Sequence, residues 1–207
     1  MAAEEDYLGL SVREFAAVTA AKSPTPGGGS VAGAVGMMGV ALGEMTLNFS
    51  KGKKKLAEHE PYYAHLSDRL EKARAMFAQL VDDDVAAYKL YQASSKLEDG
   101  PDKDEQVQLA TAAAINVPRE VMKLALAVMD DMQELAGKCN TWLITDLMAS
   151  ATLCAAAIRL SDYNVRINLP SVADTGQAKE LGESSSADLA KAGALLDAIE
   201  AVGLKCL

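Results

Sequence analysis

Two aspartates interrupt apolar stretches of the sequence, and they are the side chains best suited to acid–base chemistry. Asp84 shares a predicted helical face with Phe77, Leu80, Val81, Ala87, Tyr88 and Tyr91. Asp146 is the only charged residue within residues 139–158. A carboxylate in an apolar setting must be hydrogen-bonded, paired or protonated, and such groups can move protons or stabilise a cation. The alternative is a structural acid. Asp82 and Asp83 flank Asp84, and we expect Asp83 to face water.

A glycine-rich segment, Gly27-Gly28-Gly29-Ser30, precedes a predicted apolar helix. Because the glycines have no side chains, a ligand could contact the backbone there. Ser30 stands where a helix N-cap belongs, and the free N–H groups of a helix N-terminus can bind an oxyanion or a carbonyl. The alternative is a tight loop between two packed helices.

Two known glycine motifs do not fit this segment. A P-loop requires Gly-Lys-Ser/Thr, whereas Val31 follows Ser30 here. The spacing of Gly27, Gly29 and Ala32 matches a dinucleotide-binding motif only weakly, because a predicted helix precedes it where that motif requires a strand.

Composition narrows the class of protein. The 207 residues carry a net charge of −9, which argues against general nucleic-acid binding. A local basic cluster, Lys51-Gly52-Lys53-Lys54-Lys55, could still receive an anionic group. The three cysteines show no metal-ligand spacing and indicate reduced thiols in a cytoplasmic protein. The two histidines do not share a helical face, so we expect no metal site.

Neither a targeting segment nor a membrane span is predicted. Residues 1–6 are acidic and lack the basic and apolar parts of a signal peptide. Residues 31–43 are too short and too glycine-rich for a span. Residues 139–158 are long enough, but they contain Asp146 and several hydroxyls, and we expect them to form a buried core helix.

The hydrophobic pattern predicts a single all-α domain of about six helices, bundle-like and without a strand. Ser11 and Glu14 form a capping box that begins the first helix. Glycines at 33, 36, 39 and 43 lie near one face of the second helix, so another helix could approach closely there. Pro118 should kink the fourth helix, and residues 163–170 could extend the fifth or form a connector. The predicted helices span residues 12–22, 30–50, 61–97, 102–136, 140–160 and 174–203.

These segments, in this order, resemble the cyclodeaminase/cyclohydrolase family of folate enzymes over nearly the whole chain. The matching segments are Pro24-Thr25-Pro26-Gly27-Gly28-Gly29-Ser30, Gly52-Lys53-Lys54-Lys55, Asp82-Asp83-Asp84-Val85-Ala86-Ala87-Tyr88, Val117-Pro118, Asn140 with Thr145-Asp146-Leu147, and Tyr163-Asn164-Val165-Arg166-Ile167-Asn168-Leu169. Thr145 and Val85 replace the family's serine and alanine. The resemblance implies long antiparallel helices, a homodimer, a tetrahydrofolate ligand, and no metal or cofactor. That the third and fifth helices meet is suggested only by the resemblance.

The activity that the resemblance implies is hydrolysis of 5,10-methenyltetrahydrofolate to 10-formyltetrahydrofolate. Its reacting carbon is cationic, and carboxylates could stabilise it and accept a proton from water. We assign this role to Asp146 and Asp84, supported by Asp82 and Tyr88. The predicted binding residues are Gly27, Gly28, Gly29 and Ser30 for a substrate oxygen, Lys53, Lys54 and Lys55 for the glutamate tail, and Asn140, Asn164 and Asn168 for the pterin edge. The alternatives are a cyclodeaminase that releases ammonia from formiminotetrahydrofolate, and a non-enzymatic folate-binding or scaffold protein.

Overall fold

The computed structural model describes residues 6–207, which form six α-helices and no strand. Most of the N-terminal stretch considered above for a targeting signal lies outside these residues. The prediction of an all-α fold is confirmed. The helices are α1 (Val12–Thr19), α2 (Gly28–Asn48), α3 (Glu60–Ser94), α4 (Pro101–Ala136), α5 (Ile144–Asn168) and α6 (Thr175–Gly203).

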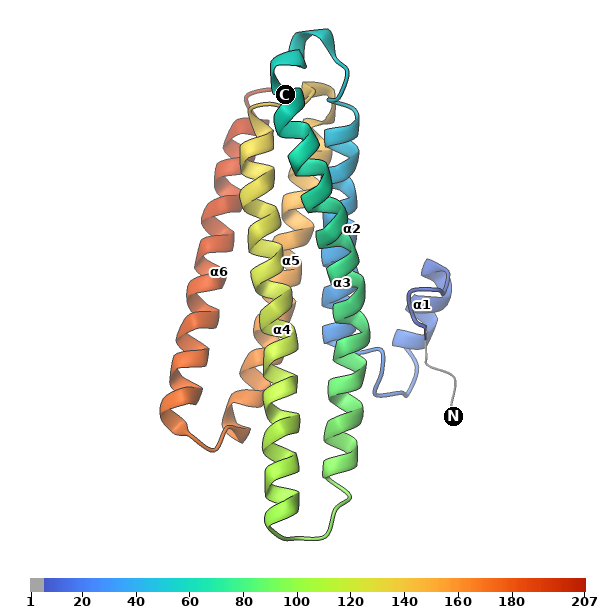
Figure 1. The fold of residues 1–207 in the computed structure, drawn as a ribbon, viewed down its shortest axis with the longest axis vertical. Coiled ribbons are helices and arrows are strands. Elements are labelled where there is room, and N and C mark those ends of the chain that lie inside the picture. The colour runs from blue at the N-terminus through green and yellow to red at the C-terminus, as the bar shows by residue number, and fades with distance from the viewer. Residues whose placement is uncertain (1–5) are drawn as a thin grey trace.

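The long helices form an elongated up-and-down bundle (Figure 1). Helices α2, α3, α4 and α5 make the four-helix core, and α6 packs along α4 and α5. The short helix α1 stands beside the bundle and contains no buried residue. Because the connections between the long helices are short, each helix begins at the end where the previous one finished.

Local signals explain where several helices begin. Ser11 and Glu14 make the predicted capping box at α1, and the Asp174 side chain caps α6. The prediction for α2 is wrong at its start: Gly27 is the N-cap and Ser30 lies inside the helix. Helix α5 continues through residue 168, so the ambiguous segment extends the helix.

Helices α2 and α5 approach closely along the predicted glycine face. A Cβ placed on Gly39 would lie 2.9 Å from Cys154 Sγ and 3.1 Å from the Ser150 carbonyl oxygen. The Ser150 hydroxyl donates a 2.6 Å hydrogen bond to the carbonyl oxygen of Gly39. Only glycine allows this separation, which confirms the predicted close approach.

Two helical segments are long and apolar enough to cross a membrane, Gly28–Asn48 and Thr141–Ser171. Inside the structure, only 50% and 39% of their most apolar windows are buried. The expectation that residues 139–158 form a buried core helix is therefore wrong in part. One side of α5 packs into the core, and its other side is exposed.

Candidate active site

A cleft of about 370 Å³ opens at the end of the bundle where α2 begins and α5 ends. Helix α3 contributes Asp84, Tyr88 and Tyr91, α4 contributes Thr111, and α5 contributes Asn164 and Asn168. The volume is within the range of small-molecule sites. Four of the predicted site residues, Asp84, Tyr88, Asn164 and Asn168, therefore line one cleft. Helices α3 and α5 both line this cleft, but they do not pack side by side, so the resemblance is right only in that their residues face the same cleft.

The start of α2 holds the Asp84 carboxylate in place. Ser30 Oγ donates a 2.7 Å hydrogen bond to Asp84 Oδ2. A Cβ added at Gly29 would collide with the same carboxylate, so the side chain rests directly against bare backbone. Burial raises the pKa of Asp84 above its ordinary value, and the hydrogen bonds from Ser30 partly oppose that rise. The cleft thus contains a carboxylate poised for proton exchange.

Two asparagines from the last turns of α5 form the opposite wall. Asn164 Nδ2 donates to the Leu160 carbonyl oxygen at 2.9 Å, and Asn168 Nδ2 donates to the Asn164 carbonyl oxygen at 2.8 Å. A Cβ on Gly28 would lie 3.6 Å from Asn164 Nδ2. Since backbone oxygens occupy both NH₂ groups, the amide oxygens are the atoms suited to accept from a ligand N–H.

The cleft also contains residues that the sequence analysis did not assign to it. Tyr91 and Ile167 are each half or more exposed, and Thr111 is buried. Tyr91 follows Asp84 by two helical turns, and Ile167 follows Asn164 by one, so helical spacing could have identified both. Thr111 carried no such signal, because it belongs to a helix without any predicted site residue.

A second group of predicted residues lies at the other end of the bundle. Asn140 donates its backbone N–H to Ser50 Oγ at 2.8 Å, and its Nδ2 to the Phe49 carbonyl oxygen at 3.2 Å, beside the end of α2. Its side chain also caps the turn Thr141–Leu143. Asp146 lies in the first turn of α5, 18 residues before Asn164, which corresponds to about 27 Å along the helix.

The three lysines share this far end. Lys53, Lys54 and Lys55 follow the end of α2 and are all exposed. Helix α2 has 21 residues, so about 30 Å separates them from the glycines at its start. Within one chain, Asp146, Asn140 and the lysines therefore do not meet the Asp84 cleft.

Three expectations about the acids need correction. Asp146 is half-exposed, because the stripe that it interrupts faces outward. Asp82 is exposed and does not line the cleft. Asp83, expected to face water, is half-buried and accepts a 3.0 Å hydrogen bond from Gln79 Nε2.

The sequence profile of the formiminotransferase-cyclodeaminase family matches residues 11–187. The chain belongs to this family. Two relatives match it over nearly their whole length. A methenyltetrahydrofolate cyclohydrolase from Methylorubrum extorquens is 29% identical, over 91% of this chain and 93% of that protein. The crystal structure of a formiminotetrahydrofolate cyclodeaminase from Thermotoga maritima superposes with a TM-score of 0.87 at 29% identity, over 94% of this chain and 96% of that chain.

Longer family members match over part of their length. The formimidoyltransferase-cyclodeaminases of Rattus norvegicus and Sus scrofa are 28% and 29% identical, and this chain spans 32% and 38% of them. The resemblance stated from the sequence motifs is thus confirmed at the level of the family.

Proposed function

We propose that this protein hydrolyses 5,10-methenyltetrahydrofolate to 10-formyltetrahydrofolate. The observation that carries the proposal is the Asp84 carboxylate, held by Ser30 against Gly29 in a cleft with two amide side chains. The name of the Methylorubrum extorquens relative, which this chain matches along 93% of its length, supports the same activity.

Each step of the reaction suits a half-buried carboxylate. In the substrate, one carbon bridges N5 and N10 and carries a positive charge, so a nearby anion stabilises it. Water adds to this carbon and gives one proton to Asp84. The bond between the carbon and N5 then breaks, and N5 takes up a proton. The formyl group stays on N10, and one proton is released overall.

The cleft has complementary groups for the rest of the ligand. We assign the amide oxygens of Asn164 and Asn168 to N–H donors on the pterin edge. Tyr88 and Tyr91 offer flat apolar surfaces for its rings. The backbone of Gly27 and Gly28 would face a substrate oxygen at the start of α2, whereas the Asp84 carboxylate covers Gly29.

A second candidate activity is cyclodeamination of formiminotetrahydrofolate with release of ammonia. The Thermotoga maritima cyclodeaminase favours it, because that structure matches this chain over 96% of its own length. Both reactions act on the same carbon and need proton transfer beside it. Loss of methenyl absorbance without ammonia release identifies the hydrolase, and stoichiometric ammonia release identifies the deaminase.

We further propose that the protein is a cytoplasmic homodimer that needs no cofactor. The three cysteines are all unpaired thiols, which supports a reducing compartment. Among residues 6–207, no three acidic, histidine or cysteine side chains are grouped as a metal site would require. The activity of protein treated with a chelator tests the cofactor proposal, and full retention is expected.

Replacement of Asp84 by Asn tests the mechanism. The amide keeps the size and an acceptor for Ser30 but cannot take a proton, so turnover should fall about 10²-fold or more. Asp83→Asn is the matched control, because that carboxylate lies next in sequence and does not line the cleft. Normal turnover by Asp84→Asn would remove Asp84 from the mechanism. Tight folate binding by the wild type without either turnover would instead indicate a binding protein.

A further inference from the structure

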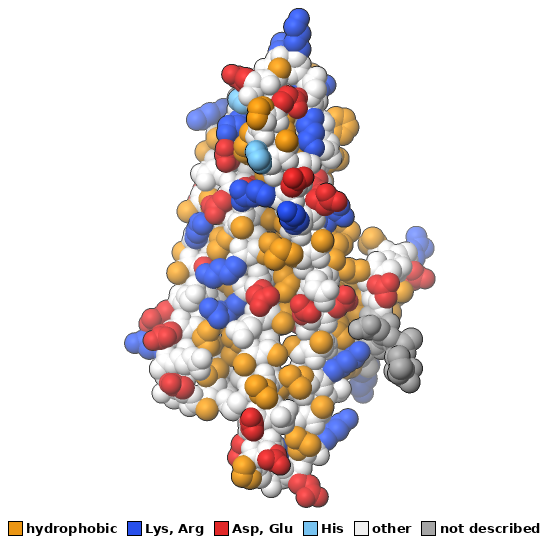
Figure 2. All heavy atoms as spheres, in the orientation of Figure 1, with side chains coloured by type: hydrophobic (Ala, Val, Ile, Leu, Met, Phe, Trp, Pro, Cys, Tyr) orange, Lys and Arg blue, Asp and Glu red, His pale blue; other side chains and the backbone are white. Residues whose placement is uncertain are grey.

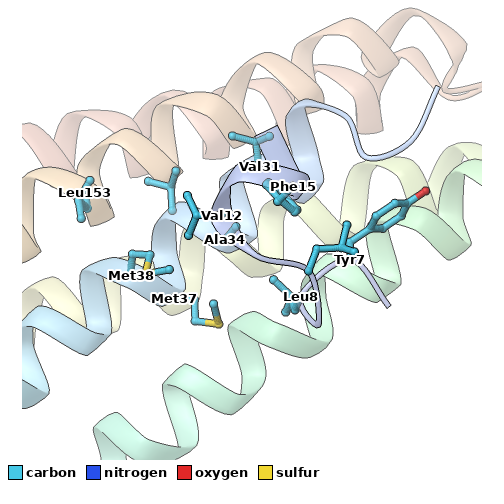
Figure 3. Close-up of a pocket in the computed structure, with 11 residues that line it drawn as sticks. Tyr7, Leu8, Val12, Phe15, Val31, Ala34, Met37, Met38 and Leu153 are labelled. Carbon is cyan, nitrogen blue, oxygen red and sulfur yellow. The ribbon is translucent and has the colours of Figure 1, made fainter. Parts of the chain in front are cut away.

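Two hollows outside the candidate active site differ in chemistry. The first, of about 420 Å³, lies between α1 and the bundle, and apolar side chains such as Val12, Phe15 and Met38 form its walls (Figure 3). Tyr7 also lines it, but the Tyr7 hydroxyl is hydrogen-bonded to Thr25 Oγ1 at 3.1 Å. These walls offer little that would orient a polar ligand.

The second hollow is polar and adjoins the active-site cleft. It has a volume of about 250 Å³ and lies between α4 and the first turns of α6, and we call it the α4–α6 hollow. Apolar side chains, Ile115 among them, form part of its wall. Its polar side chains are Gln108, Thr111, Asn116, Arg119 and Gln177.

The guanidinium of Arg119 is the strongest donor in this hollow. Arg69, Arg74 and Arg166 each lie within 2.9 Å of a carboxylate oxygen. Arg119 is half-buried, and among residues 6–207 no hydrogen bond or ion pair involves it. A guanidinium presents a planar fork of donors that matches a carboxylate, so this one is suited to bind a carboxylate from a ligand.

The charges around the hollow do not compete for Arg119. Within residues 6–207, Arg119 is the only charged side chain that lines it, and Glu120 is exposed beside it. Lys123 is paired with Asp188 at 2.6 Å, and the Asp174 carboxylate accepts from two backbone N–H groups of α6. Acidic and basic side chains are mixed over the side formed by α3, α4 and α6, so any attraction for an anion is local (Figure 2).

Thr111 gives a second, independent indication of a ligand. The residue is only 4% exposed, yet no hydrogen bond within residues 6–207 involves its hydroxyl. The hydroxyls of Thr46 and Thr152 instead donate to the carbonyl oxygen four residues earlier, at 3.1 and 2.8 Å. Because polar groups on buried residues normally have a partner, a ligand oxygen at this wall would supply the missing one.

The turn between α5 and α6 separates the hollow from the active-site cleft. Gln108 Nε2 donates to the Ser171 carbonyl oxygen at 3.3 Å, and Gln108 Oε1 accepts from the Ala173 N–H at 3.2 Å. Ser171 lines the cleft, Val172 lines the hollow, and Thr111 lines both. A ligand in the hollow would therefore touch the same turn and the same side chain as a ligand in the cleft.

We propose that the α4–α6 hollow binds a carboxylate, with Arg119 as its anchor and Thr111, Asn116 and Gln177 as further donors. The volume is below the usual range of drug-sized sites, which suits a group as small as one glutamate residue.

Two sources can supply this carboxylate. One is the glutamate end of a folate whose pterin lies in the cleft, and the other is a separate small carboxylate. Along α4, Arg119 follows Thr111 by eight residues, which corresponds to about 12 Å. Only the first source rests on the proposed function.

Calorimetric titration with γ-glutamylglutamate tests the site without any assay of turnover. This dipeptide has the carboxylates of a folate tail and no pterin. We expect millimolar binding to the wild type and at least about tenfold weaker binding to Arg119→Met, which keeps an apolar stem but loses the guanidinium. Arg13→Met is the matched control, because Arg13 is exposed on α1 and lines neither the cleft nor the hollow. Absence of binding to the wild type, or equal binding by Arg119→Met, would overturn the inference.

Thr111→Val tests the wall that the two cavities share. The change removes the hydroxyl and keeps the shape, so it should weaken binding of the dipeptide about threefold or more, and Thr111→Ser should restore it. Thr152→Val is the control, because its hydroxyl is bonded to the Met148 carbonyl oxygen on exposed α5 surface. Unaltered binding by Thr111→Val would contradict the donor role given to Thr111.

Substrates with short and long glutamate tails identify the source. If the tail enters the hollow, the KM of the wild type falls as the tail lengthens, the dipeptide competes with substrate, and Arg119→Met loses the dependence on tail length. If a separate carboxylate binds there, KM is independent of tail length, and the dipeptide still binds when the cleft is saturated. Both results support the carboxylate site.

The measurements keep the site and the activity apart. A wild type that binds the dipeptide through Arg119 but turns over neither folate refutes the proposed function and leaves the site intact. Turnover without binding of the dipeptide that depends on Arg119 overturns the site and leaves the function intact.

Discussion

The Asp84 carboxylate experiences two opposing influences. Burial favours its protonated form, and the hydroxyl of Ser30 favours its ionised form. A cationic substrate in the cleft would add a third influence and lower the pKa again. Asp84 can therefore exist as an anion when the substrate is bound and still accept a proton during the reaction.

Ser30→Ala should shift the pH dependence of turnover. Without the hydroxyl, the pKa of Asp84 rises further, so the acidic limb of the kcat/KM profile should move to higher pH. Ser161→Ala is the control, because Ser161 Oγ is buried and forms no hydrogen bond. Coincident profiles for wild type and Ser30→Ala would mean that Asp84 does not control the limb.

A second aspartate makes stability depend on pH. Asp131 is buried, its carboxylate lies 2.9 Å from Arg69 Nη2, and burial raises its pKa to about 6. Because the folded-state pKa lies above the ordinary value of 3.8, the stabilisation is complete below that value and is lost as pH rises through about 6.

Asp131→Asn should remove this dependence. Between pH 4 and 7 the wild type should lose up to about 3 kcal/mol of unfolding free energy that the variant keeps, as measured by urea denaturation. In Arg69→Met the decline should extend to higher pH, since the cation that lowers the pKa is gone. Identical slopes in all three proteins would contradict the assignment.

Sequence reasoning identified the aspartate that lines the cleft, Asp84, but not the orientations of its neighbours Asp82 and Asp83. Asp84 was recognisable because it breaks an apolar stripe, whereas Asp82 and Asp83 carry no such mark. Successive helix residues differ by about 100° in direction, so a small error in helical phase exchanges the exposed and the half-buried acid. Ser30 was misplaced because Gly27 begins the helix three residues earlier, and Ser30 then points its hydroxyl at Asp84.

Among the elements, the α2–α5 pair depends most strictly on residue size. In Gly39→Ala the new methyl group would overlap Cys154 and the Ser150 carbonyl, so the unfolding free energy should fall by about 1–3 kcal/mol. Gly193→Ala on α6 is the matched control, because nothing lies within 4 Å of the added carbon. That variant should be unchanged or stabilised by up to about 1 kcal/mol. Equal thermal midpoints for the two variants would contradict this packing.

Helix lengths also determine which of the site residues can meet within one chain. In an up-and-down bundle, α3 starts at the end where α2 finishes, and about 24 residues later it returns Asp84 to the start of α2. The same counting separates Asp146 from Asn164 along α5. The order of the motifs along the chain therefore indicates the family. The position of each residue along its helix decides which of the motif residues can lie in one cleft of a single chain.

For the whole molecule, we expect stability to depend on concentration. If folding and formation of the proposed homodimer are coupled, the thermal midpoint should rise by about 2 °C for each tenfold increase in protein concentration. Met38→Lys, on the exposed apolar side of α2, should abolish this dependence, and Met76→Lys, a similarly exposed methionine on α3, should keep it. A midpoint independent of concentration in the wild type would contradict the coupling.

The exposed side of α5 was not predicted, for a physical reason. Apolar residues in a core and apolar residues on an exposed surface look alike in composition, so residues 139–158 were expected to be internal. Only the arrangement of helices in space reveals that one side of α5 has no neighbour among residues 6–207.

The tight contact between α2 and α5 also provides a natural reporter of motion. The Cys154 thiol is fully buried beside Gly39, and burial raises its pKa to about 12. An alkylating reagent can reach this sulfur only after the two helices separate, whereas the exposed Cys206 reacts at once. The rate of the slow labelling phase, followed by mass spectrometry, would therefore report how often α2 and α5 separate locally in the unmodified protein. A bound folate should slow this phase.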